Sequence, residues 1–186
     1  MKMTAVFEKE LVNIDGKVFV PYLSNNVIRK RIRELASEIE RDYKGKNPVF
    51  LVVLKGAIFF ASELMQNVSQ PIFVEILKAE SYGNRLESSG KVNLFLTNRN
   101  FGGKDIVVVE DIIDTGLTIK TIMDELARFE PNSVELAVLL LKKEKLKFDL
   151  SIKYCGFEIP DKFVIGFGLD FAEYGRNLKD IYILKE

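Results

Sequence analysis

Histidine is absent from the 186-residue sequence, and cysteine occurs once, as Cys155. Without histidine, the chain cannot build a Ser-His-Asp or Cys-His catalytic site or a histidine-ligated zinc site. A single cysteine excludes an internal disulfide and is typical of a reducing compartment, and its apolar surroundings favour a packed side chain over a nucleophile. Acid–base chemistry near neutral pH therefore falls to carboxylates, lysine, tyrosine or water.

The sequence also lacks an excess of either charge, since 27 basic and 27 acidic residues give a net charge of zero. General nucleic-acid binders are usually basic, whereas a neutral protein can bind a polyanionic small molecule through locally concentrated donors and a metal ion. No apolar run reaches the roughly 20 residues needed to cross a bilayer. The start of the chain lacks the pattern of a secretion signal. We therefore expect a cytoplasmic protein without a membrane or nucleic-acid partner.

Strand-like and helix-like segments alternate along the chain, whose length fits one domain, 1–186. Apolar residues have helical spacing from 27 to 39, where Ser24 can cap the helix start, and helices are also expected at 57–68 and 118–129. Strands are expected at 49–54, 71–77, 92–96, 104–109, 134–141, 154–157 and 163–167. This alternation predicts an α/β fold with a mostly parallel central sheet, where ligands gather at the carboxyl ends of the strands.

The most informative segment follows the apolar strand 104–109, which runs into Glu110 and Asp111, then Asp114, then a Thr-Gly-x-Thr turn at 115–118 that opens a helix. Small residues in such a turn let a phosphate approach unpaired amides at the positive end of the helix. The paired acids suit sugar hydroxyls, or water on Mg²⁺, better than a phosphate. Each residue alone is typical of a strand end or a helix cap, but together they predict a site for a phosphorylated sugar.

The run Val-Glu-Asp-Ile-Ile-Asp-Thr-Gly at 109–116 resembles the phosphoribosyl-pyrophosphate motif of type I phosphoribosyltransferases, in particular their hypoxanthine/guanine branch. The similarity extends from about Ser24 to the C-terminus. It implies a central sheet flanked by helices, a small hood region and a mobile active-site loop. By this resemblance, the ribose and 5-phosphate site comprises Glu110, Asp111, Asp114, Thr115, Gly116, Leu117 and Thr118. Leu117 stands where the family often has a polar or basic residue, so we expect one of the family's phosphate contacts to be absent.

Two further segments match the same family. The turn 54–57 resembles the one that binds pyrophosphate through Lys55 and Gly56, commonly with a cis peptide before the lysine, and Arg176 resembles a second pyrophosphate contact. Ser81 and Tyr82 resemble the start of the mobile loop, whose closure excludes water from the ribosyl centre.

The segment 156–166 and the residues after it resemble the family's purine site. By resemblance, Phe163 stacks on the purine, the backbone of Val164 contacts its edge, and Leu169 and Asp170 complete the site. Lys142 matches a lysine that donates to the 6-oxo group, which favours hypoxanthine or guanine over adenine. Further lysines at 143, 145 and 147 make the assignment of this role to Lys142 less specific.

The resemblance implies transfer of the phosphoribosyl group from phosphoribosyl pyrophosphate to purine N9, giving IMP or GMP and pyrophosphate in purine salvage. Asp114 is the candidate general acid/base at N7. The implied cofactor is Mg²⁺, with Glu110, Asp111 and, through water, Asp170 as candidate metal-site residues. The implied partners are the donor, the purine base and the nucleotide product, in a homodimer or homotetramer.

Three alternatives stay open at this point. An RNA-binding attenuator on the same scaffold would share the ribosyl motif but carry a basic face, which the neutral composition disfavours. An enzyme that makes or hydrolyses the ribosyl donor would need an ATP site, and no P-loop pattern is present. A xanthine-preferring relative remains open, because the sequence does not rank hypoxanthine, guanine and xanthine.

Overall fold

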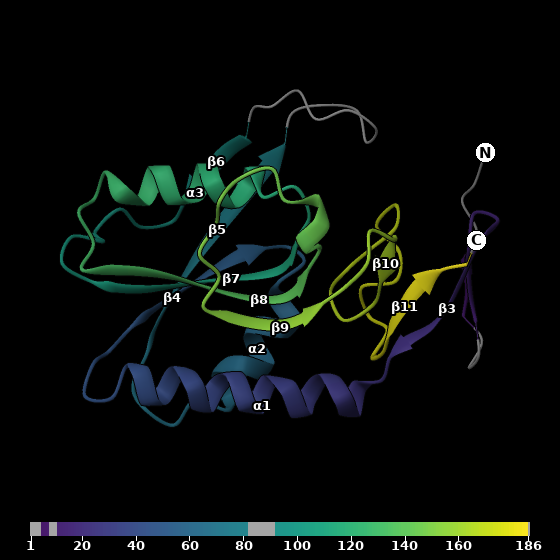
Figure 1. Cartoon of the computed structure of the whole chain (residues 1–186), viewed down its shortest axis with the longest axis horizontal. Helices are drawn as coiled ribbons and strands as arrows, with labels where there is room; N and C mark the ends of the chain where they lie inside the picture. Colours follow the sequence, from purple (N-terminus) through teal and green to yellow (C-terminus); the bar gives the residue numbers. More distant parts are fainter. Residues whose placement is uncertain (1–4, 8–10, 82–91, 186) are drawn as a thin grey trace.

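A six-stranded sheet forms the centre of the molecule (Figure 1). The structure is a computed structural model that describes residues 5–7, 11–81 and 92–185. The strand order is β6-β5-β4-β7-β8-β9, and all neighbours are parallel except the edge strand β6, which runs antiparallel to β5. The bounds are β4 (Val49–Leu54), β5 (Phe73–Ser81), β6 (Val92–Leu96), β7 (Asp105–Ile113), β8 (Ser133–Leu141) and β9 (Tyr154–Glu158).

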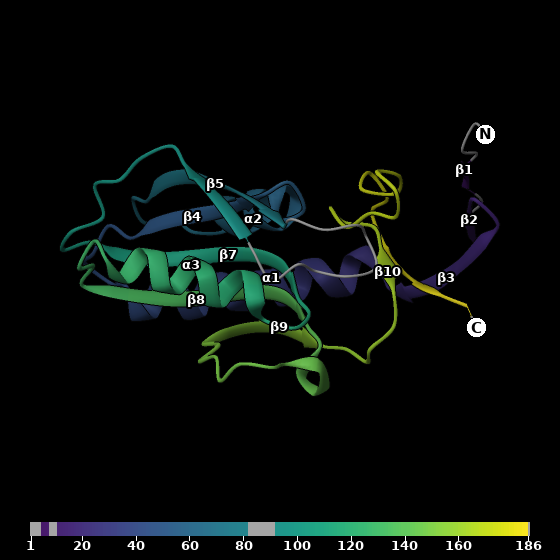
Figure 2. The ribbon, with the colours of Figure 1, turned by 90° about the horizontal axis from the view of Figure 1, so that it is seen from above.

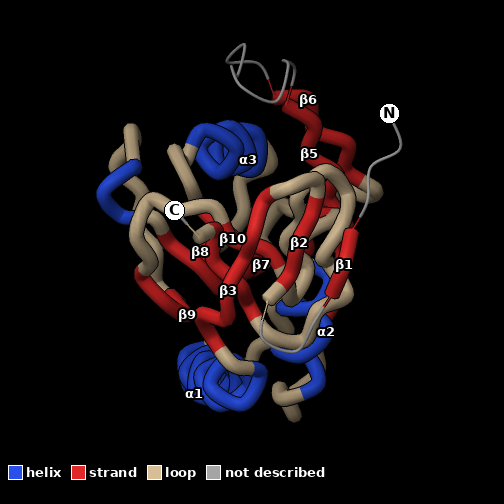
Figure 3. Tube along the Cα trace, turned by 90° about the vertical axis from the view of Figure 1, so that its right-hand side faces the viewer, coloured by secondary structure: helices blue, strands red, loops and turns tan. Residues whose placement is uncertain are grey.

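Helices cover both faces of this sheet. Figures 1 and 3 show α1 (Asn25–Asp42) and α2 (Ile58–Gln66) on one face and α3 (Leu117–Ala127) on the other. Successive residues of the buried strand β4 pack alternately, with Phe50 and Val52 toward α1 and α2, and Leu51 and Val53 toward α3. Burial on both faces explains why the central strands are almost continuously apolar. The predicted α/β fold with a mostly parallel sheet is therefore confirmed.

The start of α1 differs in one detail from the expectation. Its buried side chains recur at helical spacing, as predicted, and Ser24 is the N-cap residue with an extended backbone. The Ser24 side chain, however, makes no capping hydrogen bond. Asp180 replaces it, because its carboxylate oxygen accepts a 2.6 Å bond from the backbone N–H of Asn25. The cap therefore comes from a residue distant in sequence, which also ties the C-terminal region to this helix.

A smaller antiparallel sheet forms the hood, in the order β1-β2-β3-β11-β10. Figure 2 shows β3 and β10 beyond one end of the central sheet. Its own core contains the fully buried ring of Phe19, together with Val12, Ile14, Ile165 and Tyr182. Of these strands, only β10 was predicted, and it is shorter than the expected strand 163–167. The bounds are β1 (Ala5–Phe7), β2 (Val12–Ile14), β3 (Lys17–Leu23), β10 (Val164–Ile165) and β11 (Ile181–Leu184).

Two central strands extend by four residues beyond the predicted ends, and β9 extends by one. The strand β7 continues through Glu110 and Asp111 to Ile113 because it keeps its ladder with β8, in which Glu110 lies opposite Val138. The strand β5 reaches Ser81 because it pairs with β6, where Ser81 lies opposite Val92. Tyr82, the second residue expected in the mobile loop, lies outside the described residues. Among the helices that the structure does describe, none combines the length and the apolar character needed to span a membrane.

Candidate active site

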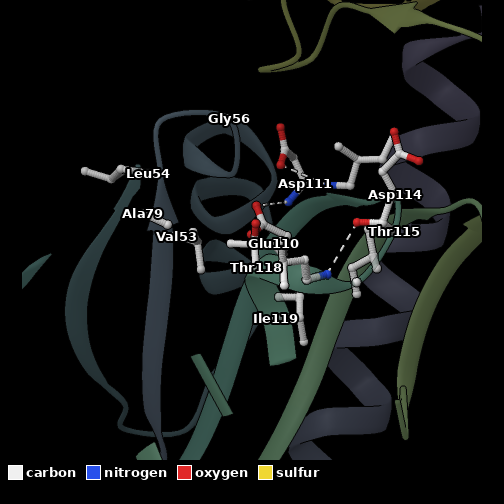
Figure 4. Close-up of a pocket in the computed structure, with 14 residues that line it drawn as sticks. Val53, Leu54, Gly56, Ala79, Glu110, Asp111, Asp114, Thr115, Thr118 and Ile119 are labelled. Carbon is white, nitrogen blue, oxygen red and sulfur yellow. Dashed lines mark hydrogen bonds between the residues drawn. The ribbon is translucent and has the colours of Figure 1, made fainter. Parts of the chain in front are cut away.

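The turn between β7 and α3 lines a cavity of about 250 Å³ at the carboxyl ends of the strands (Figure 4). Gly116 is the N-cap residue of α3 with φ of 85°, a left-handed conformation that glycine adopts without strain. The hydroxyl of Thr115 lies 3.5 Å from the backbone N–H of Leu117. Neither Asp114 nor Thr118 caps the helix, and both residues line the cavity. The first-turn amides and the positive end of α3 therefore border a space suited to an anion.

Glu110 and Asp111 lie side by side at the edge of this cavity, with only 8% and 9% of their surfaces exposed. Burial raises the pKa of both carboxyls, and the neighbouring charge of Asp111 raises the pKa of Glu110 further. Glu110 accepts a 3.1 Å bond from the backbone N–H of Asp111, and Asp111 accepts a 2.9 Å bond from that of Ile112. These bonds leave carboxylate acceptor capacity for a ligand such as a sugar with free hydroxyls.

The turn after β4 approaches Asp111 closely. The peptide bond between Leu54 and Lys55 is cis, as the family resemblance implied. Gly56 has no side chain to separate the turn from the acid: a Cβ there would overlap the carboxylate Oδ2 of Asp111 and lie 2.6 Å from its Cγ. On the other side, a Cβ at Gly168 would overlap the carbonyl oxygen of Gly56. The two glycines therefore allow three chain segments to meet at one point.

The cations expected to bind pyrophosphate converge on one acid beside this meeting point. The ammonium of Lys55 lies 3.2 Å from the carboxylate of Glu173, and the guanidinium of Arg176 lies 3.6 Å from it. Lys55, and then Arg176, lower the pKa of Glu173, so this acid is a carboxylate at neutral pH. Arg176 also contacts Asp170 at 2.7 Å and donates to the carbonyl of Gly168 at 2.8 Å. Glu173 was not among the site residues expected from the sequence.

A second cavity, of about 680 Å³, lies against the hood. Asp111, Ile112 and Asp114 line both cavities, which are therefore neighbours. All five residues expected at the purine site line the second one: Lys142, Phe163, Val164, Leu169 and Asp170.

The two halves of the second cavity differ in chemistry. Phe163 is 45% exposed although it is aromatic, and the ring of Phe171 meets it edge-on at 5.5 Å. Phe19 supports both rings from the hood core, at 6.4 Å and 6.1 Å. The other half of the cavity is charged: Lys142 is only 6% exposed, and its ammonium pairs with the carboxylate of Asp114 at 3.4 Å. A flat ring with a polar edge suits such a cavity, because one wall offers an aromatic face and another offers donors.

Six further residues that line this cavity were not expected there from the sequence, and four of them have charged or aromatic side chains: Lys17, Lys145, Asp161 and Phe171. Lys145 follows Lys142 by three positions, the spacing of one 3₁₀-helical turn, but the neighbouring lysines at 143 and 147 obscure this pattern in the sequence. Asp161 lies two residues before Phe163 in a segment that was already singled out. The hood residues Lys17 and Phe171 had no separate signal.

The acids of the site fit a metal ion that arrives with its ligand. Among the described residues, no three histidine, cysteine, aspartate or glutamate side chains group closely enough to hold an ion alone. Mg²⁺ is commonly bound by one or two carboxylates together with substrate phosphates. Asp170 and the buried pair Glu110 and Asp111 border the cavities where such phosphates would lie. These donors therefore suit Mg²⁺ shared with a phosphorylated ligand.

Comparison with known proteins gives a consistent result. The family model described as the phosphoribosyl transferase domain matches residues 22–172. A hypoxanthine-guanine phosphoribosyltransferase from Aquifex aeolicus is 40% identical over 175 residues, which cover 93% of this chain and 98% of the relative. One from Dictyostelium discoideum is 43% identical over 164 residues, covering 86% and 91%.

A solved structure agrees with these relatives. The crystal structure of a hypoxanthine-guanine phosphoribosyltransferase from Bacillus anthracis superposes with a TM-score of 0.83 at 39% identity, covering 89% of this chain and 98% of that chain. The same family is indicated by the motif at 109–116, by the two neighbouring cavities and by the match to the family model. The chain belongs to the phosphoribosyltransferase family.

Proposed function

We propose that this phosphoribosyltransferase moves the 5-phosphoribosyl group from phosphoribosyl pyrophosphate to N9 of hypoxanthine or guanine, giving IMP or GMP and pyrophosphate in purine salvage. The names of its relatives support this acceptor class. The observation that carries the proposal is the pair of neighbouring cavities that share Asp111, Ile112 and Asp114. One has the helix N-terminus and acids suited to a sugar phosphate, and the other has the aromatic and cationic walls suited to a 6-oxopurine.

The ribosyl donor is held from two sides in this account. The 5-phosphate lies against the amides and hydroxyls of the turn Thr115, Gly116, Leu117 and Thr118, where the helix dipole stabilises its charge. Glu110 and Asp111 accept hydrogen bonds from the ribose hydroxyls. Holding the sugar rigidly brings its anomeric carbon toward the purine nitrogen and lowers the entropic part of the barrier.

Departure of pyrophosphate needs positive charge around it. Lys55 and Arg176 supply it once the leaving group displaces the carboxylate of Glu173, and the backbone of Gly56 allows close approach. When bound, Mg²⁺ neutralises part of the pyrophosphate charge, with Glu110, Asp111 and water on Asp170 as the protein side of its site. This assignment rests on the donor chemistry and on the positions of these acids, since Glu110 lines the first cavity, Asp170 the second and Asp111 both.

The base is oriented by Lys142, Phe163 and Val164. The ring of Phe163 stacks on the purine, and the buried ammonium of Lys142 donates a hydrogen bond to the 6-oxo group. An amino group at the same position of the purine could not accept that hydrogen bond. Asp114 takes the proton at N7 while N9 forms its bond to the anomeric carbon. With no histidine in the chain, a carboxylate in this role also agrees with the composition.

Steady-state rates with hypoxanthine, guanine, xanthine and adenine, each with phosphoribosyl pyrophosphate and Mg²⁺, test the proposal. We expect turnover with hypoxanthine or guanine and none above background with adenine, because Lys142 presents only donors. Lys142→Ala should raise the KM for the 6-oxopurine far more than the KM for the ribosyl donor. Equal rates with adenine, or an unchanged KM for the base in the variant, would contradict the assignment.

We also propose a cytoplasmic homodimer or homotetramer, as the family resemblance implies. Analytical ultracentrifugation of the full chain distinguishes these from a monomer.

A further inference from the structure

Four charged side chains of alternating sign form a closed ring beside the purine cavity. Lys142 lies 3.4 Å from Asp114 and 3.3 Å from Asp161, and Lys145 lies 3.1 Å from Asp114 and 3.0 Å from Asp161. All four line the same cavity. Each carboxylate is therefore held between two ammonium groups, and the ring as a whole is neutral.

The backbone fixes the positions of these four side chains. Lys142 follows β8, and its N–H donates to the carbonyl of Ile113 at 3.0 Å, next to Asp114 in sequence. Lys145 ends a short 3₁₀ turn, and its N–H donates to the carbonyl of Lys142 at 3.0 Å. Asp161 enters from the connection between β9 and β10. The ring thus joins three segments that meet only in the folded chain.

Purine binding changes the charge balance of this ring. Lys142 must turn from the acids to the 6-oxo group. The side chain of Lys142 is 7% exposed, whereas the side chain of Lys145 is 38% exposed. If Lys142 were the only cation, two carboxylates would compete with the purine for its ammonium. Burial alone would lower the pKa of Lys145, but the bonds to Asp161 and Asp114 raise it, so Lys145 remains a cation. It can neutralise both acids after Lys142 turns away.

We propose that Lys145 is a positioning residue for 6-oxopurine binding, which holds the carboxylates of Asp114 and Asp161 and so frees Lys142 for the base. This inference rests on the proposed function and deepens it. Lys145 itself does not touch the purine in this account; it acts through Lys142. Its removal therefore affects the base and not the ribosyl donor.

Lys145→Met is the direct test, with KM measured separately for hypoxanthine and for phosphoribosyl pyrophosphate. An exposed ion pair changes an equilibrium constant up to about fivefold, so we expect the KM for hypoxanthine to rise by about that factor while the KM for the donor stays within about twofold. Lys145→Arg keeps the charge and should keep the wild-type KM. The double variant Lys145→Met with Asp161→Asn removes the competing carboxylate as well and should bring the KM for hypoxanthine back within about twofold of wild type.

Lys143→Met is the matched control. Lys143 lies in the same turn and pairs with Glu158 at 3.2 Å, but it does not line the cavity, so its loss should leave both KM values unchanged. An unchanged KM for hypoxanthine in Lys145→Met, or a rise that Asp161→Asn fails to reverse, would overturn the inference. A wild-type chain that turns over no 6-oxopurine would instead overturn the proposed function, so the two failures are distinguishable.

Discussion

Replacing Gly56 by alanine tests the close approach between the pyrophosphate turn and the buried acid Asp111. A Cβ at this position would overlap Oδ2 of Asp111 and lie 2.6 Å from its Cγ, whereas ordinary contact begins at 3.4 Å. The carboxyl group must therefore move by about 1 Å. Misplacement of that size in an active site costs about 100-fold in rate, equivalent to about 2.7 kcal/mol of transition-state stabilisation.

The assay is the steady-state kcat/KM for phosphoribosyl pyrophosphate with hypoxanthine at saturation, together with thermal unfolding. We expect Gly56→Ala to lower kcat/KM by at least about 100-fold while the protein still unfolds cooperatively. Gly102→Ala is the control, because a Cβ there meets only the carbonyl oxygen of Phe129 at 3.3 Å, away from both cavities. Wild-type kcat/KM in Gly56→Ala would refute the placement of Asp111 against this turn.

Three further predictions follow from separate parts of the structure. Asp114→Asn should lower kcat by about 100- to 10,000-fold while calorimetry gives an unchanged Kd for phosphoribosyl pyrophosphate; equal turnover would remove its acid–base role. Phe19→Ala should lower the free energy of unfolding by about 3 kcal/mol in urea titrations, because its ring is fully buried in the hood; a loss below about 1 kcal/mol would contradict this packing. The carboxylate of Asp42 accepts bonds from Lys153 and Tyr154 that hold its pKa below the ordinary range. The stabilisation is therefore present above about pH 4 and is lost as pH falls through the lowered pKa, so the melting-temperature difference between wild type and Asp42→Asn should vanish in acid. A constant difference across pH would argue against this ion pair.

Local patterns predicted the central sheet well because buried strands and amphipathic helices have distinct periods. They predicted the end of β7 too early, since Glu110 and Asp111 interrupt the apolar run while still pairing with β8. Charge normally signals a strand end, and here it signals a strand that enters a ligand site. Composition alone does not separate these two cases.

The family resemblance implied a hood, but its strands β1, β2, β3 and β11 were missed, for a different reason. Asp15 and Gly16 form the two-residue turn between β2 and β3, with positive φ at both positions and Ile14 paired with Lys17. An Asp-Gly pair between short apolar runs is a strong hairpin signal, so this element could have been predicted. The strand β11, by contrast, pairs with β3 from the far end of the chain, and no local pattern specifies that pairing.

The site shows the same division between local and distant information. Residues of contiguous motifs, such as those from Asp114 to Thr118, line one cavity together, and their spacing in the sequence was the signal that grouped them. Glu173 and Asp161 were missed because their roles depend on which cations the fold brings to them: Lys55 and Arg176 in one case, and two lysines in the other. Such partners are set by tertiary structure.

Product analysis after mixing the purified chain with phosphoribosyl pyrophosphate, Mg²⁺ and hypoxanthine tests the central claim most directly. If one site joins a sugar-phosphate cavity to a 6-oxopurine cavity, IMP and pyrophosphate must appear in equal amounts, with both substrates consumed in step. Release of pyrophosphate without IMP, or the absence of both products at saturating substrates, would contradict the account.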